Sequence, residues 1–204
     1  MLFRSGDPVR AGDQPGSRPV NELESVRLLQ LVSRFNAGED PLGGPLPDGG
    51  TRLFAGAAAD PQTRSWNGLT ARLRRKQEAG AQFVQTQMVM DVQALRRFID
   101  EVTAPLGLPV LAGVFLLKSA RNARFINRVV PGACIPDALI ERLERSADPG
   151  AEGVAIAAEQ VADYRRYAQG VHLMAIKAEE RIPEILDHAG VRAIQGQSVP
   201  VAVG

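Results

Sequence analysis

The stretch AQFVQTQMVMD, residues 81–91, is the part of the sequence that decides the fold. Phe83, Val84, Val89 and the methionines of this stretch are apolar, and Gly80 punctuates its start. A continuous apolar run of this length is typical of a strand that is buried on both faces within a parallel sheet. We therefore expect a central parallel strand over these residues.

Two glutamines, Gln85 and Gln87, interrupt this apolar run. A buried amide needs hydrogen-bond partners, because leaving it unpaired costs about 1–3 kcal/mol. Two interpretations stay open at this point. Either neighbouring backbone groups satisfy the amides, or an amide faces a ligand at the carboxyl end of the strand, where parallel α/β folds place their binding sites.

Four further segments have the composition of strands, and amphipathic or alanine-rich helices separate them. The expected strands are residues 1–3, 52–57, 81–91, 109–117 and 171–176, and the expected helices are residues 21–35, 65–79, 92–102, 119–130, one opening at 135–137, 154–169 and 181–189. Strands that alternate with helices at crossover length predict a parallel sheet with right-handed crossovers. Residues 191–204 carry little signal, and we expect a weakly structured tail there.

Composition limits the classes of function. The 204 residues carry a formal net charge of +1 with both signs interspersed, so we expect neither a nucleic-acid partner nor a membrane partner. Cys134 is the only cysteine, which excludes an intramolecular disulfide and a cysteine-based metal site built by this chain alone. The longest strongly apolar run, residues 108–117, is too short to span a bilayer, and the N-terminus lacks the features of a signal peptide. We therefore expect a cytoplasmic protein without a bound metal.

Two segments are candidates for ligand binding. The helix expected at residues 65–79 carries Arg72, Arg74, Arg75 and Lys76, which form either a solvated face or a phosphate-binding surface. The Gly- and Pro-rich loop that begins SGDP at residues 5–8 is either a connector or a ligand cradle.

Several segments resemble, in the same order and along nearly the whole chain, the methylenetetrahydrofolate reductase family. The most specific combination is EAGAQFVQTQ with LKSARNARF and a later VPG..IP pattern. The other matching segments are SGDP, GDQPGSRPV, ESVRLLQLV, FAGAAADP, EGVAIAAE and GVHLMAIKAEERIPEILDHAG.

The resemblance implies a fold and an activity. The matched part corresponds to strands 4–8 of a (β/α)8 TIM barrel, so residues 1–204 are expected to form a single, incomplete barrel domain of α/β class with parallel strands and outer helices. The family passes a hydride from NAD(P)H to FAD and then to 5,10-methylenetetrahydrofolate, which gives 5-methyltetrahydrofolate. The alternative is a non-catalytic truncated relative that binds flavin or folate or serves as an interaction subunit.

The resemblance also implies site residues. Asp7 corresponds to a catalytic aspartate near the flavin and the pterin, and Gly6 lets the backbone approach the cofactor, although both residue types also favour plain turns. The remaining expected contacts are Arg75 and Lys76 with the FAD diphosphate, and Gln87 and Asn122 with the folate.

Departures from the family pattern shape further expectations. The first three barrel strands are missing, and with them the glutamate that acts as general acid. Asp60 stands where one branch has a histidine, and Ala178 where another has a folate-contacting arginine, while His172 and His188 are expected at a strand end and on a helix surface. An open barrel leaves two exposed strand edges, so we expect weak FAD retention and either a homo-oligomer or a partner chain that supplies the missing strands.

Overall fold

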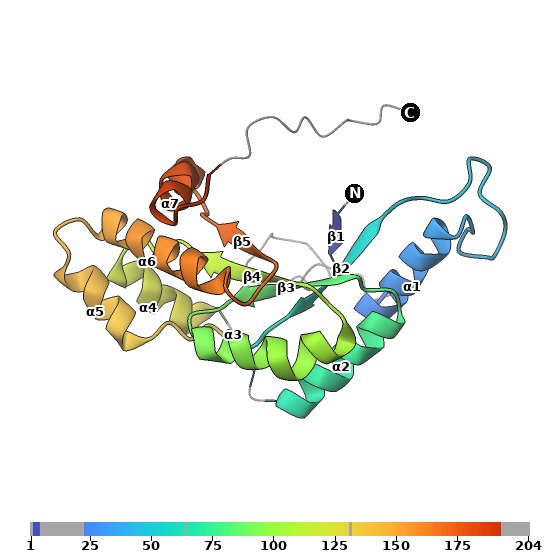
Figure 1. Ribbon diagram of the computed structural model, residues 1–204, viewed down its shortest axis with the longest axis horizontal. Coiled ribbons are helices and arrows are strands. Elements are labelled where there is room, and N and C mark those ends of the chain that lie inside the picture. Colours follow the sequence, from blue (N-terminus) through green and yellow to red (C-terminus); the bar gives the residue numbers. More distant parts are fainter. Residues whose placement is uncertain (1, 5–22, 64, 131, 193–204) are drawn as a thin grey trace.

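The structure, a computed structural model, describes residues 2–4, 23–63, 65–130 and 132–192 (Figure 1). Its centre is a five-stranded sheet in which all neighbouring strands are parallel and follow the order of the chain. The strands are β1 (Leu2–Arg4), β2 (Phe54–Ala59), β3 (Phe83–Met88), β4 (Val110–Phe115) and β5 (Gly170–Met174). The helices are α1 (Ser25–Asn36), α2 (Trp66–Glu78), α3 (Val92–Phe98), α4 (Ala120–Val129), α5 (Asp137–Arg145), α6 (Pro149–Tyr164) and α7 (Ile182–His188).

Five of these helices, α1, α2, α3, α6 and α7, pack on one face of this sheet. Alternate strand residues share one core with residues of α1, α2, α3, α6 and α7; on β2 and β4 these are Ala55, Ala57, Ala59, Val110, Ala112 and Val114. Crossovers of one hand in a sequentially ordered parallel sheet place every helix on the same side. This confirms the predicted partial (β/α)8 barrel, in which the other face of the sheet is the barrel interior. Strands β1 and β5 form the two edges of the described sheet.

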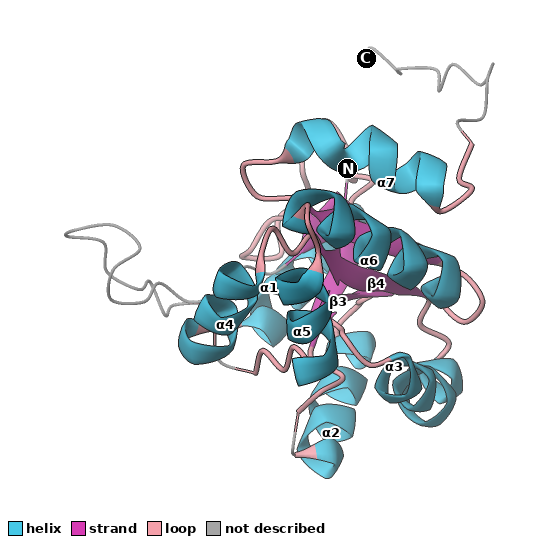
Figure 2. Cartoon of the chain, turned by 90° about the vertical axis from the view of Figure 1, so that its left-hand side faces the viewer, coloured by secondary structure: helices cyan, strands magenta, loops and turns pink. Residues whose placement is uncertain are grey.

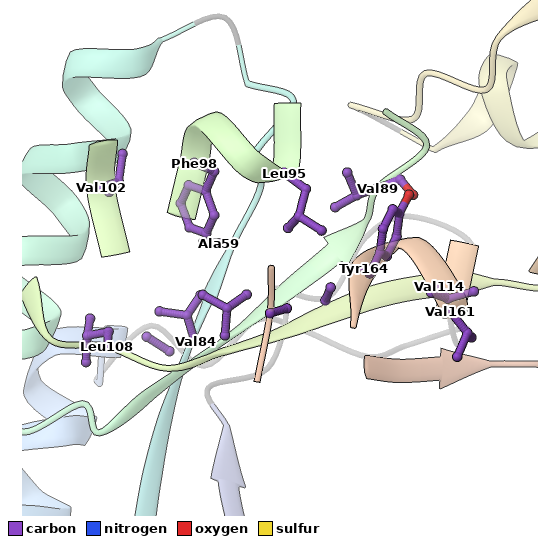
Figure 3. Packing of buried hydrophobic residues seen from close by; sticks show 14 of the residues in the cluster. Ala59, Val84, Val89, Leu95, Phe98, Val102, Leu108, Val114, Val161 and Tyr164 are labelled. Carbon is purple, nitrogen blue, oxygen red and sulfur yellow. The ribbon is translucent and has the colours of Figure 1, made fainter. Parts of the chain in front are cut away.

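The main core lies between the sheet and α3 (Figure 3). Leu95 and Phe98 of α3 and Val84 of β3 are fully buried, and each such side chain stabilises the fold by about 1.5–3 kcal/mol. Tyr164 of α6 is 1% exposed, and its hydroxyl donates a hydrogen bond of 2.6 Å to the carbonyl of Val89. This bond ties α6 to the segment that follows β3.

Three helices connect β4 to β5, and only the last of them covers the sheet. Helix α6 lies next to β4 (Figure 2). Helices α4 and α5 contribute Ile126, Ile140 and Leu143 to a separate core that also contains Met90 and Leu117. Figure 1 shows this pair on the left, beyond the carboxyl ends of the strands. The α4–α5 pair therefore forms one wall of the end of the sheet where a binding site is expected.

Local capping sets two boundaries that differ from the predicted ones. Helix α6 begins at Pro149, five residues before the predicted start, because the Asp148 side chain accepts hydrogen bonds of 3.0 Å from the next two free backbone N–H groups. Strand β3 ends at Met88 instead of Asp91, which caps α3 by accepting a bond of 2.8 Å from the backbone N–H of Gln93.

Candidate functional site

The amino-terminal part of the interior face is aromatic. Phe54 and Phe83 stack with ring centroids 5.2 Å apart, and Phe83 lies directly over Gly56, where a Cβ atom would come within 2.2 Å of its ring. Phe54 is 44% exposed. The amino-terminal part of the sheet therefore presents an apolar surface to the barrel interior. The polar groups of this face lie further along the strands, toward their carboxyl ends.

Gln85 and His172 form a polar pair in the middle of the interior face. The Gln85 side chain is 7% exposed, and its Nε2 lies 2.6 Å from Nδ1 of His172 across strand β4. Gln85 is thus a satisfied amide, but its partner is a side chain two strands away and not neighbouring backbone. The expectation that His172 ends its strand is wrong, because it is the third of the five residues of β5.

Gln87 lies in an irregular part of β3. The register with β4 shifts between Gln85 and Met88, and the backbone approaches Gly113 so closely that a Cβ there would lie 2.4 Å from the Gln87 carbonyl oxygen. Thr86 stabilises this segment by donating a hydrogen bond of 2.7 Å to that carbonyl and accepting one of 2.8 Å from the Gly113 N–H. The half-buried side-chain amide of Gln87 forms no hydrogen bond with another described residue, so it is available to a ligand at the carboxyl end of the strand.

Lys76 projects from the last turn of α2 to the edge of β2. Its Nζ donates a hydrogen bond of 3.0 Å to the carbonyl of Ala58, and no carboxylate of the described residues forms a salt bridge with it. Burial lowers the pKa of this ammonium, and the nearby charge of Arg72 lowers it further. The charge of a bound anion would raise this pKa again, and this favours Lys76 over the neighbouring exposed Arg75 as the stronger of the two predicted phosphate contacts.

Gly6 and Asp7 lie outside the described residues, so their roles stay predictions. The last described residue before them, Arg4, pairs with Gly56 at the edge of β2. Gly56 lies two positions before Ala58, whose carbonyl accepts the hydrogen bond from Lys76.

The hydrogen bonds at the start of α4 fix the position of Asn122. Its backbone N–H donates to Oγ of Ser119 at 3.1 Å, and its side-chain oxygen accepts from the backbone N–H of Lys118 at 3.3 Å. Ser119 thus caps α4, and the Asn122 side chain holds the backbone of the residue before the cap, so both bonds stabilise the start of the helix. The Asn122 oxygen therefore has a structural role, and the NH₂ group is the part that a ligand could contact.

Asp60 was identified in the sequence only as a departure from the family pattern. It follows β2 directly and lines a cavity of about 470 Å³ with Gln62, Gly132 and Cys134. Burial raises the pKa of the Asp60 carboxyl, and a hydrogen bond of 2.9 Å from the backbone N–H of Gln62 lowers it in part. A carboxyl group with a raised pKa thus lies at the same end of the sheet as Gln87.

The candidate site residues are arranged as in other parallel barrels, near the carboxyl ends of the strands. The carboxyl group of Asp60, the amide of Gln87 and the capped start of α4 lie at the carboxyl ends of β2, β3 and β4, respectively, while the partly desolvated ammonium of Lys76 lies at the edge of β2. Such a set suits a ligand with a hydrogen-bonding heterocycle and an anionic group. The fold and these groups define a protein of the (β/α)8-barrel class with its polar groups at the carboxyl end of the sheet.

Comparison with known proteins identifies the family. The chain belongs to the methylenetetrahydrofolate reductase family, which it matches over residues 1–190. Among solved structures, it resembles an uncharacterized protein from Clostridium thermocellum that binds two copies of 5-methyl-5,6,7,8-tetrahydrofolic acid. The TM-score is 0.50 at 18% sequence identity, and the match covers 67% of this chain and 52% of that one.

The chain thus spans about half the length of that structural neighbour, and the likeness between the two concerns the fold. A comparison with curated proteins found no significant match. None of the helices in the described ranges is long and apolar enough to cross a membrane.

Proposed function

We propose that this chain carries flavin- and folate-binding elements of an FAD-dependent methylenetetrahydrofolate reductase. FAD, when bound, would supply the hydride-transfer chemistry that links oxidation of NAD(P)H to reduction of 5,10-methylenetetrahydrofolate to 5-methyltetrahydrofolate. Membership of the family over residues 1–190 supports this proposal, and so does the bound 5-methyltetrahydrofolate of the structural neighbour.

The observation that carries the cofactor part is the environment of Lys76. Its ammonium is partly desolvated at the edge of β2 and has no salt-bridge partner in the described part of the chain. A diphosphate would supply the missing negative charge, and the exposed Arg75 would add a second, weaker contact. The adjoining loop with Gly6 and Asp7 would place a carboxylate near the flavin ring, where it modulates the charge of the ring.

The observation that carries the folate part is the amide of Gln87. An amide both donates and accepts hydrogen bonds, which matches the mixed donors and acceptors of a pterin edge. The Thr86 and Gly113 contacts hold the Gln87 backbone in position, so the side chain is presented from a rigid segment. The NH₂ group of Asn122 would contribute a second contact from the start of α4.

The second candidate function is a non-catalytic flavin- or folate-binding or interaction subunit. The open interior face favours it, because Phe54 remains 44% exposed and both sheet edges are unpaired in the described residues. Under either function, further strands that pair with these two edges would enclose this face.

Titrations of FAD and of 5-methyltetrahydrofolate test the proposed contacts. Flavin fluorescence should show that Lys76→Met weakens FAD binding by about tenfold, as expected for the loss of a charged hydrogen bond. Arg74→Met, which removes an exposed cation of the same helix, is the control and should leave FAD binding unchanged. Gln87→Ala should weaken folate binding to a similar extent.

Stopped-flow measurements then test the reaction. Flavin reduction by NADH or NADPH, followed by reoxidation with 5,10-methylenetetrahydrofolate, supports the reductase. Folate binding without FAD binding supports the non-catalytic subunit instead. If Lys76→Met and Arg74→Met bind FAD equally well, the phosphate role of Lys76 is wrong.

A further inference from the structure

The loop between α1 and β2, residues 37–53, projects away from the body of the protein (Figure 1). It is longer than about 15 residues, and loops of that length within compact domains are usually either functional or unstructured. This loop is ordered by its own hydrogen bonds. The Oδ1 atom of Asp40 accepts from the backbone N–H groups of Leu42 and Gly44 at 2.8 and 2.7 Å, and the Asp40 N–H donates to the Gly44 carbonyl at 2.7 Å. A tip that is fixed in advance favours a binding role.

The tip of this loop, formed by Pro41, Leu42 and Pro45, is apolar and exposed. Leu42 is 95% exposed, more than any other large hydrophobic residue in the described ranges. Asp48, on the same loop, is also exposed and forms no salt bridge with another described residue. Because burial of an apolar side chain is favourable, the loop tip suits an apolar surface that has positive charges beside it.

The outer face of α4, formed by Arg121, Phe125, Arg128 and Val129, is such a surface. Phe125 is 51% exposed and Val129 is 46% exposed, and the two lie one helical turn apart. Arg121 and Arg128 lie one turn before and one turn after Phe125, and α4 contains no acidic residue. Neither arginine forms a salt bridge with a carboxylate of the described residues. The outer face of α4 therefore combines exposed apolar side chains with positive charge.

We propose that this chain associates with a second copy of itself head to tail, with the loop tip of one copy on the outer face of α4 of the next. Leu42 packs against Phe125 and Val129, and Asp48 lies toward Arg128. Figure 1 shows the loop and α4 at opposite ends of the molecule, so the contact joins two different surfaces of two copies. Copies joined in this way form a ring or an open chain.

Charge favours this pairing over the two symmetric ones. Contact between two loop tips would bring acidic residues together, and contact between two α4 faces would bring arginines together; in both cases like charges repel. The unpaired edges of the described sheet, at β1 and β5, are a separate route to association. The experiment therefore has to separate the head-to-tail contact from both symmetric contacts and from edge pairing.

Sedimentation by analytical ultracentrifugation compares the wild type with Leu42→Asp, Phe125→Asp and Leu23→Asp. Concentrations reach about 100 μM, where weak specific interfaces associate. Leu23→Asp is the matched control, because Leu23 is another exposed leucine, at 49%. Leu42→Asp keeps the outer face of α4 intact, and Phe125→Asp keeps the loop tip intact. An equimolar mixture of these two variants therefore restores one contact, which a misfolded chain would not do.

We expect the wild type and Leu23→Asp to associate equally, and Leu42→Asp and Phe125→Asp each to associate about tenfold more weakly. The mixture of the last two should form a one-to-one pair. Added salt should weaken association, because the paired charges are at the surface. A monomeric wild type, a mixture that stays monomeric or association that does not depend on salt overturns the inference. Wild-type association of either single variant overturns it too, and points to a symmetric contact or to edge pairing.

Discussion

Substitution of Gly113 by alanine tests how β3 is held against β4. The added Cβ atom would lie 2.4 Å from the carbonyl oxygen of Gln87, 2.8 Å from its carbonyl carbon and 2.9 Å from the carbonyl oxygen of Thr86. All three are backbone atoms, so no side chain can rotate away. Ordinary contact begins near 3.4 Å, which means that β3 must move by about 1 Å.

Overpacking of this kind costs about 1–3 kcal/mol, which in a chain of this size lowers the melting temperature by roughly 2–12 °C. Thermal and urea unfolding, followed by circular dichroism and by the fluorescence of the single tryptophan, Trp66, measures the loss. Gly150→Ala is the control, because its Cβ meets only the ends of side chains and alanine favours the helix by up to about 1 kcal/mol. A Gly113→Ala variant that unfolds together with the wild type would refute the close approach of the two strands.

Two further predictions concern buried polar groups. Tyr164→Phe should lower the free energy of unfolding by about 1–3 kcal/mol in urea, because the Val89 carbonyl loses its buried partner, whereas Tyr167→Phe should have little effect. Burial raises the pKa of Asp60, so the folded state holds this proton more tightly than the unfolded chain, and stability is lost as pH rises above the ordinary value of 3.8. Asp60→Asn should therefore be more stable than wild type near pH 7 but not near pH 3, and the opposite trend would contradict the assignment.

The architecture could be predicted from the sequence because each strand is bounded by punctuation and followed by a periodic helix. All five predicted strands are present, in the expected parallel arrangement. The start of α6 was predicted too late, although Asp148 followed by Pro149 is a capping signal that the sequence displays. The predicted start at residue 154 instead followed the alanine-rich pattern, which begins further along the helix.

The sequence could predict where a candidate residue lies within its own strand or helix, as for Gln87 near the end of a buried strand. The roles of these residues stay predictions. The Gln85–His172 pair depends on two strands that are separated by a third, and no local pattern in the sequence encodes that contact. The partial desolvation of Lys76 likewise arises from tertiary packing.

The strand order has a consequence for synthesis on the ribosome. Each strand pairs with the one made just before it, so no later strand has to be inserted between two earlier ones. The sheet can therefore grow one βα unit at a time, in the direction of translation. At every stage the newest strand is the growing edge of the nascent sheet. Chaperones that protect the emerging chain need to shield that advancing edge, because the strands behind it are already paired on that side.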